Sequence, residues 1–91
     1  MESIEIIARG KVQGVGFRNF VFQTASSLQL KGFTLNQADG SVRTIAIGER
    51  SKLESLVAEI RKGNKFSIVS SVDTRWNPEI NEEFKDFGIR T

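Results

Sequence analysis

The chain has 91 residues, of which 38% are hydrophobic and 26% charged, so composition and length predict one globular domain spanning residues 1–91. It contains no cysteine and no histidine, which excludes disulfides, thiolate nucleophiles and the usual nitrogen or sulfur metal sites. The formal net charge is only +2 and the basic residues are scattered, so we expect no nucleic-acid partner. No apolar run approaches the length of a membrane helix, and we expect a cytoplasmic monomer that has no membrane partner.

Hydrophobic periodicity and turn residues divide the chain into predicted elements. They are, in order, a strand at 3–9, a helix at 17–28, strands at 33–36 and 41–47, a helix at 51–62, a strand at 66–76 and a short strand at 84–90. Gly32 is interpreted as the stop signal of the first helix, and Asp39-Gly40 marks a hairpin turn. Ser51 and Glu54 form a capping box at the start of the second helix. The alternation of the long strand slips at Ser70-Ser71, which indicates a bulge.

This order of elements is βαββαβ followed by one short C-terminal strand. It predicts an α+β fold of the ferredoxin-like, split-βαβ type, in which two helices pack on one face of a mainly antiparallel sheet. Many different functions occur on this fold, so the topology alone does not identify a reaction.

A glycine-rich loop joins the first strand to the first helix and is the main candidate for a binding site. It reads Gly10-Lys11-Val12-Gln13-Gly14-Val15-Gly16-Phe17-Arg18. Glycines in a tight connection are common punctuation. This helix, however, also lacks a Ser, Thr, Asp or Asn at its start, whereas the second helix has its predicted capping box. Water could satisfy the first N–H groups, but so could an anion, because glycine lets a ligand approach the backbone.

Arg18 and Asn36 are the candidate functional side chains. Arg18 lies in the first turn, where a cation opposes the helix dipole by about 0.3–1 kcal/mol unless an anion lies between them; the alternative is a solvated surface arginine. Asn36 lies where a strand runs into a turn, which is also a common position for a plain turn former. Because a helix crossover joins the first two strands, these strands run parallel. Asn36 and the 13–18 loop therefore meet at one edge of the sheet.

This edge offers an arginine, an amide and backbone N–H groups, but no obvious general base. Apart from Asp39 in the turn, no carboxylate lies in the loop or beside Asn36, and the chain has no histidine or cysteine. Such a site suits a substrate that is already activated and brings its own negative charge. An acyl phosphate fits, because its anhydride bond is labile and its phosphate oxygens could take the proton of the attacking water.

These residues resemble the acylphosphatase family. The matching segments are Gly10-x-Val12-Gln13-Gly14-Val15-x-Phe17-Arg18, Gly32-Phe33-x-x-Asn36, Asp39-Gly40-Ser41-Val42 and Phe87-x-Ile89-Arg90, and the resemblance covers essentially the whole chain. It implies hydrolysis of a small-molecule acyl phosphate to a carboxylate and inorganic phosphate, without a metal or cofactor. Inorganic phosphate would be product or inhibitor.

The resemblance also implies roles for single residues. The phosphate would be bound by Gln13, Gly14, Val15, Gly16, Phe17 and Arg18, and Asn36 would position the attacking water. Three departures from the family pattern are Leu35 where an arginine is frequent, Phe33 where a tryptophan is frequent, and Gly63-Asn64-Lys65 in place of a Gly-Pro-Pro-like segment. None of them touches Arg18 or Asn36, but Leu35 removes a charge near the site and bears on rate and specificity.

Two other functions stay open at this point. One is a non-catalytic module that binds phosphate or acyl phosphate, as in acylphosphatase-like domains of larger carbamoyl-transfer enzymes; the length of the chain argues against it. The other is an RNA-binding module of the same topology. Such modules stack bases on strand aromatics, but the predicted strand at 41–47 carries none.

Overall fold

The computed structural model describes all 91 residues, and its elements follow the predicted order. They are β1 Glu2–Lys11, α1 Phe17–Ser27, β2 Lys31–Asn36, β3 Val42–Gly48, α2 Arg50–Lys62, β4 Ile68–Trp76 and β5 Phe87–Arg90. One sheet of five strands has the order β4-β1-β3-β2-β5. All strand pairs are antiparallel except β2 with β5, so the predicted ferredoxin-like α+β fold is confirmed.

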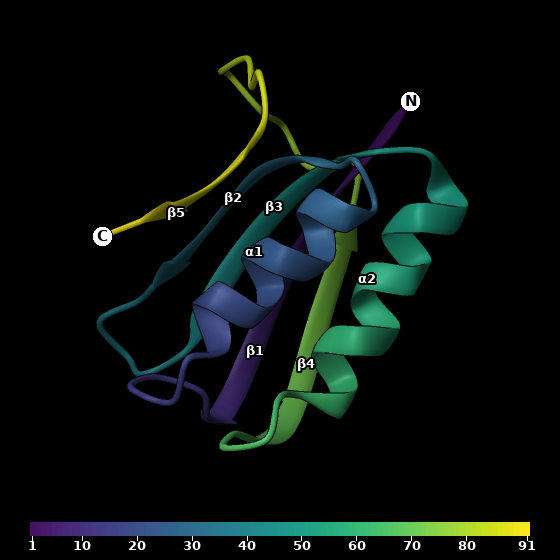
Figure 1. Ribbon diagram of the computed structural model, residues 1–91. Coiled ribbons are helices and arrows are strands. Elements are labelled where there is room, and N and C mark those ends of the chain that lie inside the picture. The colour runs from purple at the N-terminus through teal and green to yellow at the C-terminus, as the bar shows by residue number, and fades with distance from the viewer.

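Both helices pack on the same face of the sheet, side by side (Figure 1). The core lies between the two layers and consists mainly of the apolar stripes that the periodicity predicts. Its members include Ile4, Ile6, Ala8, Phe17, Val21, Ala25, Ala46, Leu53, Leu56 and Ile60. Burial of each large side chain contributes about 1.5–3 kcal/mol, which holds the helices against the sheet. None of the helices has both the length and the apolar character that crossing a bilayer requires.

The central position of β3 explains how the two candidate regions meet. β1 and β2 each pair with β3 in the antiparallel sense, so they run parallel to one another with β3 between them. The ends of β1 and β2 therefore reach the same edge of the sheet. There the loop that precedes α1 lies beside the turn between β2 and β3 (Figure 1).

The predicted bulge in β4 is confirmed. Arg9 pairs with Ser71 and Gly10 pairs with Val69, so Ser70 is an extra residue in β4. At this point Gly10 has φ 122°, and a side chain there would collide with the backbone of β4. Gly10 therefore serves the packing of the two strands.

Several predicted boundaries differ from the observed ones by one or two residues, and two of these differences have a clear structural reason. Gly32 does not stop α1, because the helix ends at Ser27. Gly32 instead lies within β2 at φ 138°, where a side chain would collide with the backbone of Ile45. β4 begins at Ile68 rather than Phe66, because a turn occupies the residues before it.

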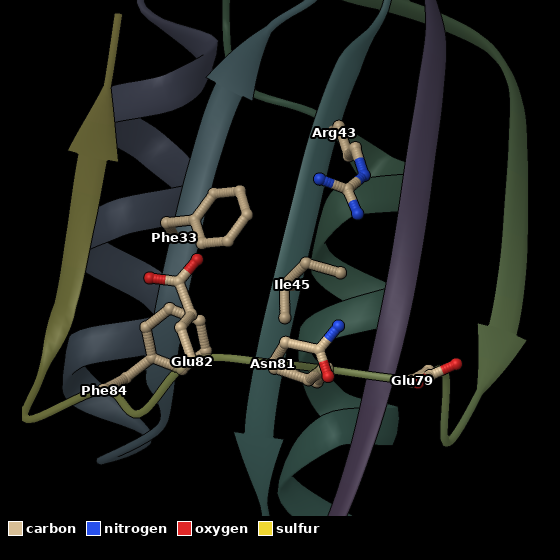
Figure 2. A pocket seen from close by; sticks show the side chains of 8 residues that line it. Phe33, Arg43, Ile45, Glu79, Asn81, Glu82 and Phe84 are labelled. Carbon is tan, nitrogen blue, oxygen red and sulfur yellow. The ribbon is translucent and has the colours of Figure 1, made fainter.

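The last strand is also shorter than predicted, because β5 begins at Phe87 rather than Phe84. The segment 77–86 that precedes it crosses the face of the sheet opposite the helices (Figure 2). There the ring of Phe84 lies 5.7 Å from that of Phe33, centroid to centroid. Glu82 forms two hydrogen bonds with Arg90, at 3.0 and 2.7 Å. These contacts, rather than strand pairing, fix the residues before β5.

The predicted capping box of α2 is wrong. The helix begins at Arg50 with Glu49 as its N-cap, and no side chain bonds to its first N–H groups. The guanidinium of Arg50 instead lies 3.6 Å from the centroid of the Trp76 ring and pairs with Glu2 at 2.8 Å. These tertiary contacts anchor the first turn in place of a Ser51 cap.

Replacement of Ser51 by alanine should therefore leave stability almost unchanged. Loss of an N-cap typically costs about 1 kcal/mol, whereas an exposed substitution of this kind changes the free energy of unfolding by less than about 0.5 kcal/mol. Urea unfolding of the two proteins measures the difference. A decrease of about 1 kcal/mol or more in the free energy of unfolding would contradict the structure and would show that Ser51 is an N-cap.

Candidate active site at the start of the first helix

Two glycines shape the loop between β1 and α1. Gly14 has φ 73° and Gly16, the N-cap of α1, has φ 74°, both in the left-handed region that costs other residues roughly 1–2 kcal/mol. No side chain caps the helix, and the first backbone bond of this region runs from the Phe20 N–H to the Gly16 carbonyl. The backbone N–H groups of residues 13–19 have no hydrogen-bond partner in the protein. A run of free donors at a helix N-terminus is a site that favours anions.

The same loop borders a hollow of about 200 Å³. Its wall consists of Val12, Gly14, Gly16, Phe17, Arg18, Asn19, Asn36 and Ile89. The loop, the first turn of α1, the end of β2 and β5 all contribute to it. The hollow is smaller than the roughly 300–1,000 Å³ pockets of drug-sized ligands, so it suits a small substrate. The structure thus brings Arg18 and Asn36 together, as the topology predicts.

Arg18 has a single hydrogen bond within the protein. Its Nη1 donates to the carbonyl oxygen of Arg90 at 2.8 Å, and no carboxylate lies within ion-pair distance. By contrast, Arg50 in the first turn of α2 is paired with Glu2. A guanidinium carries several donors, so most of those of Arg18 remain available to a ligand. Arg18 is an unpaired cation beside unpartnered backbone donors.

Asn36 lies at the end of β2 on the helix-covered side of the sheet. It pairs with Val42, a core residue, and residues directly opposite in an antiparallel pair share a face. The Asn36 Oδ1 atom is buried and accepts no hydrogen bond from the protein. An unsatisfied buried acceptor costs about 1–3 kcal/mol, and a donating water would remove that cost.

Gln13 belongs to the 13–18 loop that is predicted to bind phosphate (the phosphate loop), but its side chain binds the β2–β3 turn instead. The Gln13 Nε2 atom donates to the carbonyl oxygens of Gln37 and Ser41, at 2.8 and 2.9 Å. These bonds tie the loop to the β2–β3 turn and so hold Asn36 beside the start of α1. Gln13 does not line the hollow, and its backbone N–H has no hydrogen-bond partner in the protein.

Several residues of the site were missed by the sequence analysis. Val12, Asn19 and Ile89 line the hollow, and the side chain of Ile89 is exposed there. Val15 does not line it; its carbonyl oxygen accepts a hydrogen bond from Asn64 Nδ2 at 2.8 Å. The departure from the family pattern at Gly63-Asn64-Lys65 was the only signal in the sequence that pointed to Asn64.

Asp39 is the carboxylate nearest to Asn36 in the sequence, and its oxygens bind Ser41 and Arg9 at the β2–β3 turn. It accepts hydrogen bonds from the hydroxyl and the backbone N–H of Ser41, at 2.6 and 3.0 Å, and it pairs with Arg9 at 2.9 Å. The Ser41 hydroxyl, then its N–H and Arg9, hold the pKa of Asp39 well below its usual value. A carboxylate with so low a pKa is a weak general base.

A second hollow of about 210 Å³ lies on the opposite, helix-free face of the sheet (Figure 2). Its wall consists of Phe33, Arg43, Ile45, Glu79, Ile80, Asn81, Glu82 and Phe84. Arg43, the one cation in this wall, is paired with Glu5 at 2.8 Å, and Glu82 is paired with Arg90 at 2.7 Å. The hollow beside α1, whose arginine is unpaired, is therefore the better site for an anion.

Fold and site together define an α+β domain in which a glycine loop, a helix N-terminus, an arginine and an asparagine border one small hollow with unpaired hydrogen-bond donors. The family model for acylphosphatase matches residues 4–89. The chain belongs to the acylphosphatase family.

Individual relatives agree with this assignment. The acylphosphatase of Salinibacter ruber is 41% identical over 81 residues, which are 89% of this chain and 84% of the relative. The crystal structure of acylphosphatase from Bacillus subtilis matches with a TM-score of 0.93 at 35% identity, over 100% of both chains. Full-length HypF in its phosphate- and nucleotide-bound form matches with a TM-score of 0.89 at 33% identity, over 99% of this chain and 12% of that chain.

Proposed function

We propose that this member of the acylphosphatase family hydrolyses acyl phosphates to a carboxylate and inorganic phosphate, without a metal or cofactor. One observation carries the proposal: a single small hollow is bordered by unpartnered backbone N–H groups, the unpaired cation of Arg18 and the unsatisfied amide oxygen of Asn36. Its wall contains no carboxylate, histidine or cysteine. Relatives named acylphosphatase that cover most of the chain support the same reaction.

In this mechanism the phosphate loop and Arg18 bind the phosphoryl group. The oxygens of the phosphoryl group accept hydrogen bonds from the N–H groups of Gln13, Gly14, Val15, Gly16, Phe17 and Arg18 and from the Arg18 guanidinium. These donors stabilise the negative charge that the transition state carries on the phosphoryl oxygens. The bond from Arg18 to the Arg90 carbonyl restrains the guanidinium before the substrate arrives, which reduces the entropy lost on binding.

Asn36 orients the attacking water. The water donates a hydrogen bond to Asn36 Oδ1, and its oxygen attacks phosphorus. The bond between phosphorus and the bridging oxygen breaks, and the carboxylate leaves with the electron pair. One proton of the water passes to a phosphate oxygen of the substrate, because the wall of the hollow provides no general base. The substrate therefore supplies both the labile anhydride bond and the oxygen that accepts the proton of the water.

We also propose an oligomeric state, a location and a product inhibitor for this protein. The chain acts as a cytoplasmic monomer without a nucleic-acid or membrane partner, and inorganic phosphate inhibits it as a product. Phe33 is an aromatic residue of the open sheet face. The Phe84 ring covers it, and the Arg90 Cζ atom lies 4.0 Å from the centroid of its ring, which argues against base stacking there.

Hydrolysis of benzoyl phosphate, with and without EDTA, tests the reaction. We expect turnover at the same rate in both samples, because the wall of the hollow has no carboxylate, imidazole or thiolate to hold a metal ion. Loss of activity on chelation would show that a metal takes part.

The alternative function is a non-catalytic module that binds phosphate or acyl phosphate. The observation in its favour is the match to HypF, a longer protein solved in a phosphate- and nucleotide-bound form, in which the matched region is 12% of the chain. The same assay distinguishes the two functions when it is combined with a phosphate titration. Binding of phosphate without turnover of benzoyl phosphate would support the module and refute the hydrolase.

A further inference from the structure

The segment that follows α2 contacts the phosphate loop through one side chain. Asn64 is half-buried, and its Nδ2 atom donates to the carbonyl oxygen of Val15 at 2.8 Å. A Cβ atom placed on Gly16, the next residue of the loop, would lie 3.7 Å from the same nitrogen. Asn64 therefore holds the loop at the peptide that joins Val15 to Gly16.

Asn64 is itself firmly held. Its backbone N–H donates to the Ser67 hydroxyl at 2.9 Å, and its carbonyl oxygen accepts the Ser67 backbone N–H at 3.2 Å. Gly63 precedes it with φ 74°, and a side chain at Gly63 would collide with Ser67. The Asn64 Oδ1 atom is buried without a partner, so the one side-chain hydrogen bond of this amide is the bond from Nδ2 to the loop.

This bond sets the direction of one backbone donor. The peptide between Val15 and Gly16 is planar and trans, so its C=O and N–H groups point in opposite directions. Asn64 holds the carbonyl toward the segment after α2, and the N–H of Gly16 consequently points the other way. Gly16 lines the hollow, and its N–H has no partner in the protein.

We propose that Asn64 is a positioning residue, which preorganises the Gly16 N–H for the phosphoryl group of the substrate. The inference rests on the proposed function. Gly14 and Gly16 make this loop conformationally permissive, so without the anchor the peptide can rotate and present the Val15 carbonyl oxygen to the anion.

The variant Asn64→Ala tests the inference. We expect kcat/KM for benzoyl phosphate to fall about 5–10-fold and the inhibition constant of inorganic phosphate to rise by a similar factor, which corresponds to one hydrogen bond. Nuclear magnetic resonance gives a direct readout of the donor. In the wild-type protein, titration with inorganic phosphate should shift the Gly16 amide proton downfield, and in Asn64→Ala this shift should be much smaller.

The matched control is Asn77→Ala. Asn77 accepts a hydrogen bond from the Ser3 N–H at 3.0 Å through its Oδ1, far from the loop in the sequence and outside the wall of the hollow. This control should keep both the activity and the Gly16 shift. Equal losses in both variants, or an unchanged Asn64→Ala, would overturn the inference. If the wild-type protein binds phosphate at Gly16 but does not hydrolyse benzoyl phosphate, the proposed reaction fails and the Gly16 shifts alone decide the role of Asn64.

Discussion

Replacement of Arg18 by alanine is expected to reduce kcat/KM for benzoyl phosphate by more than roughly 10²-fold. Charge-assisted hydrogen bonds contribute about 1.5–3 kcal/mol each, and the variant loses more than one of them. Within the protein the side chain makes only the bond to the Arg90 carbonyl, so stability should fall by no more than about 1 kcal/mol. Steady-state kinetics and urea unfolding measure the two effects separately.

Two further variants sharpen this experiment. Arg18→Lys keeps the charge but loses the planar fork of donors, so its activity should lie between that of the wild type and that of Arg18→Ala. Arg61→Ala is the control, because Arg61 is exposed on α2 and has no ion pair. Full activity in Arg18→Ala would remove the phosphate site proposed here.

Replacement of Asn36 by alanine should reduce kcat by about 10²–10³-fold, the scale for loss of a positioned polar catalytic group. The affinity for inorganic phosphate should stay near that of the wild type, because Asn36 acts on the water and not on the phosphate. The variant should also be as stable as the wild type or slightly more stable, because it removes a buried oxygen that has no partner in the protein. Lower activity with unimpaired stability is the expected signature.

Asn19→Ala provides the comparison for Asn36. Asn19 lies in the wall of the same hollow but is exposed, and the mechanism gives it no task. We expect its replacement to have little effect on kcat. If Asn36→Ala keeps the wild-type kcat, or if it loses phosphate affinity to the same degree as Arg18→Ala, Asn36 does not orient the water.

The fold and the meeting of Arg18 with Asn36 could be predicted because they depend on local patterns and on one topological rule. The apolar stripes of α1 and α2 identify the helices, and parallel β1 and β2 must end at one edge. Given that edge, the loop before α1 and the last residue of β2 have to be neighbours. No knowledge of side-chain contacts is required for this step.

Tertiary contacts explain what could not be predicted. The capping box at Ser51 and Glu54 has the right spacing, but the stacking of Arg50 on Trp76 anchors the start of the helix instead. The bonds from Gln13 to the turn and from Asn64 to the loop join residues far apart in the chain, and an amide side chain does not reveal its acceptor in the sequence. Hydrogen-bond partners so far apart in the sequence become apparent only in the folded structure.

The uncapped start of α1 limits how this protein could be made more robust. A carboxylate introduced near Gly16 would satisfy the vacant N–H groups and neutralise Arg18, as engineered caps do in other helices. The same carboxylate would act as an intramolecular competitive inhibitor, because it would occupy the N–H groups and the guanidinium that are proposed to bind the phosphate. Selection for catalysis therefore opposes selection for thermal robustness at this one helix end.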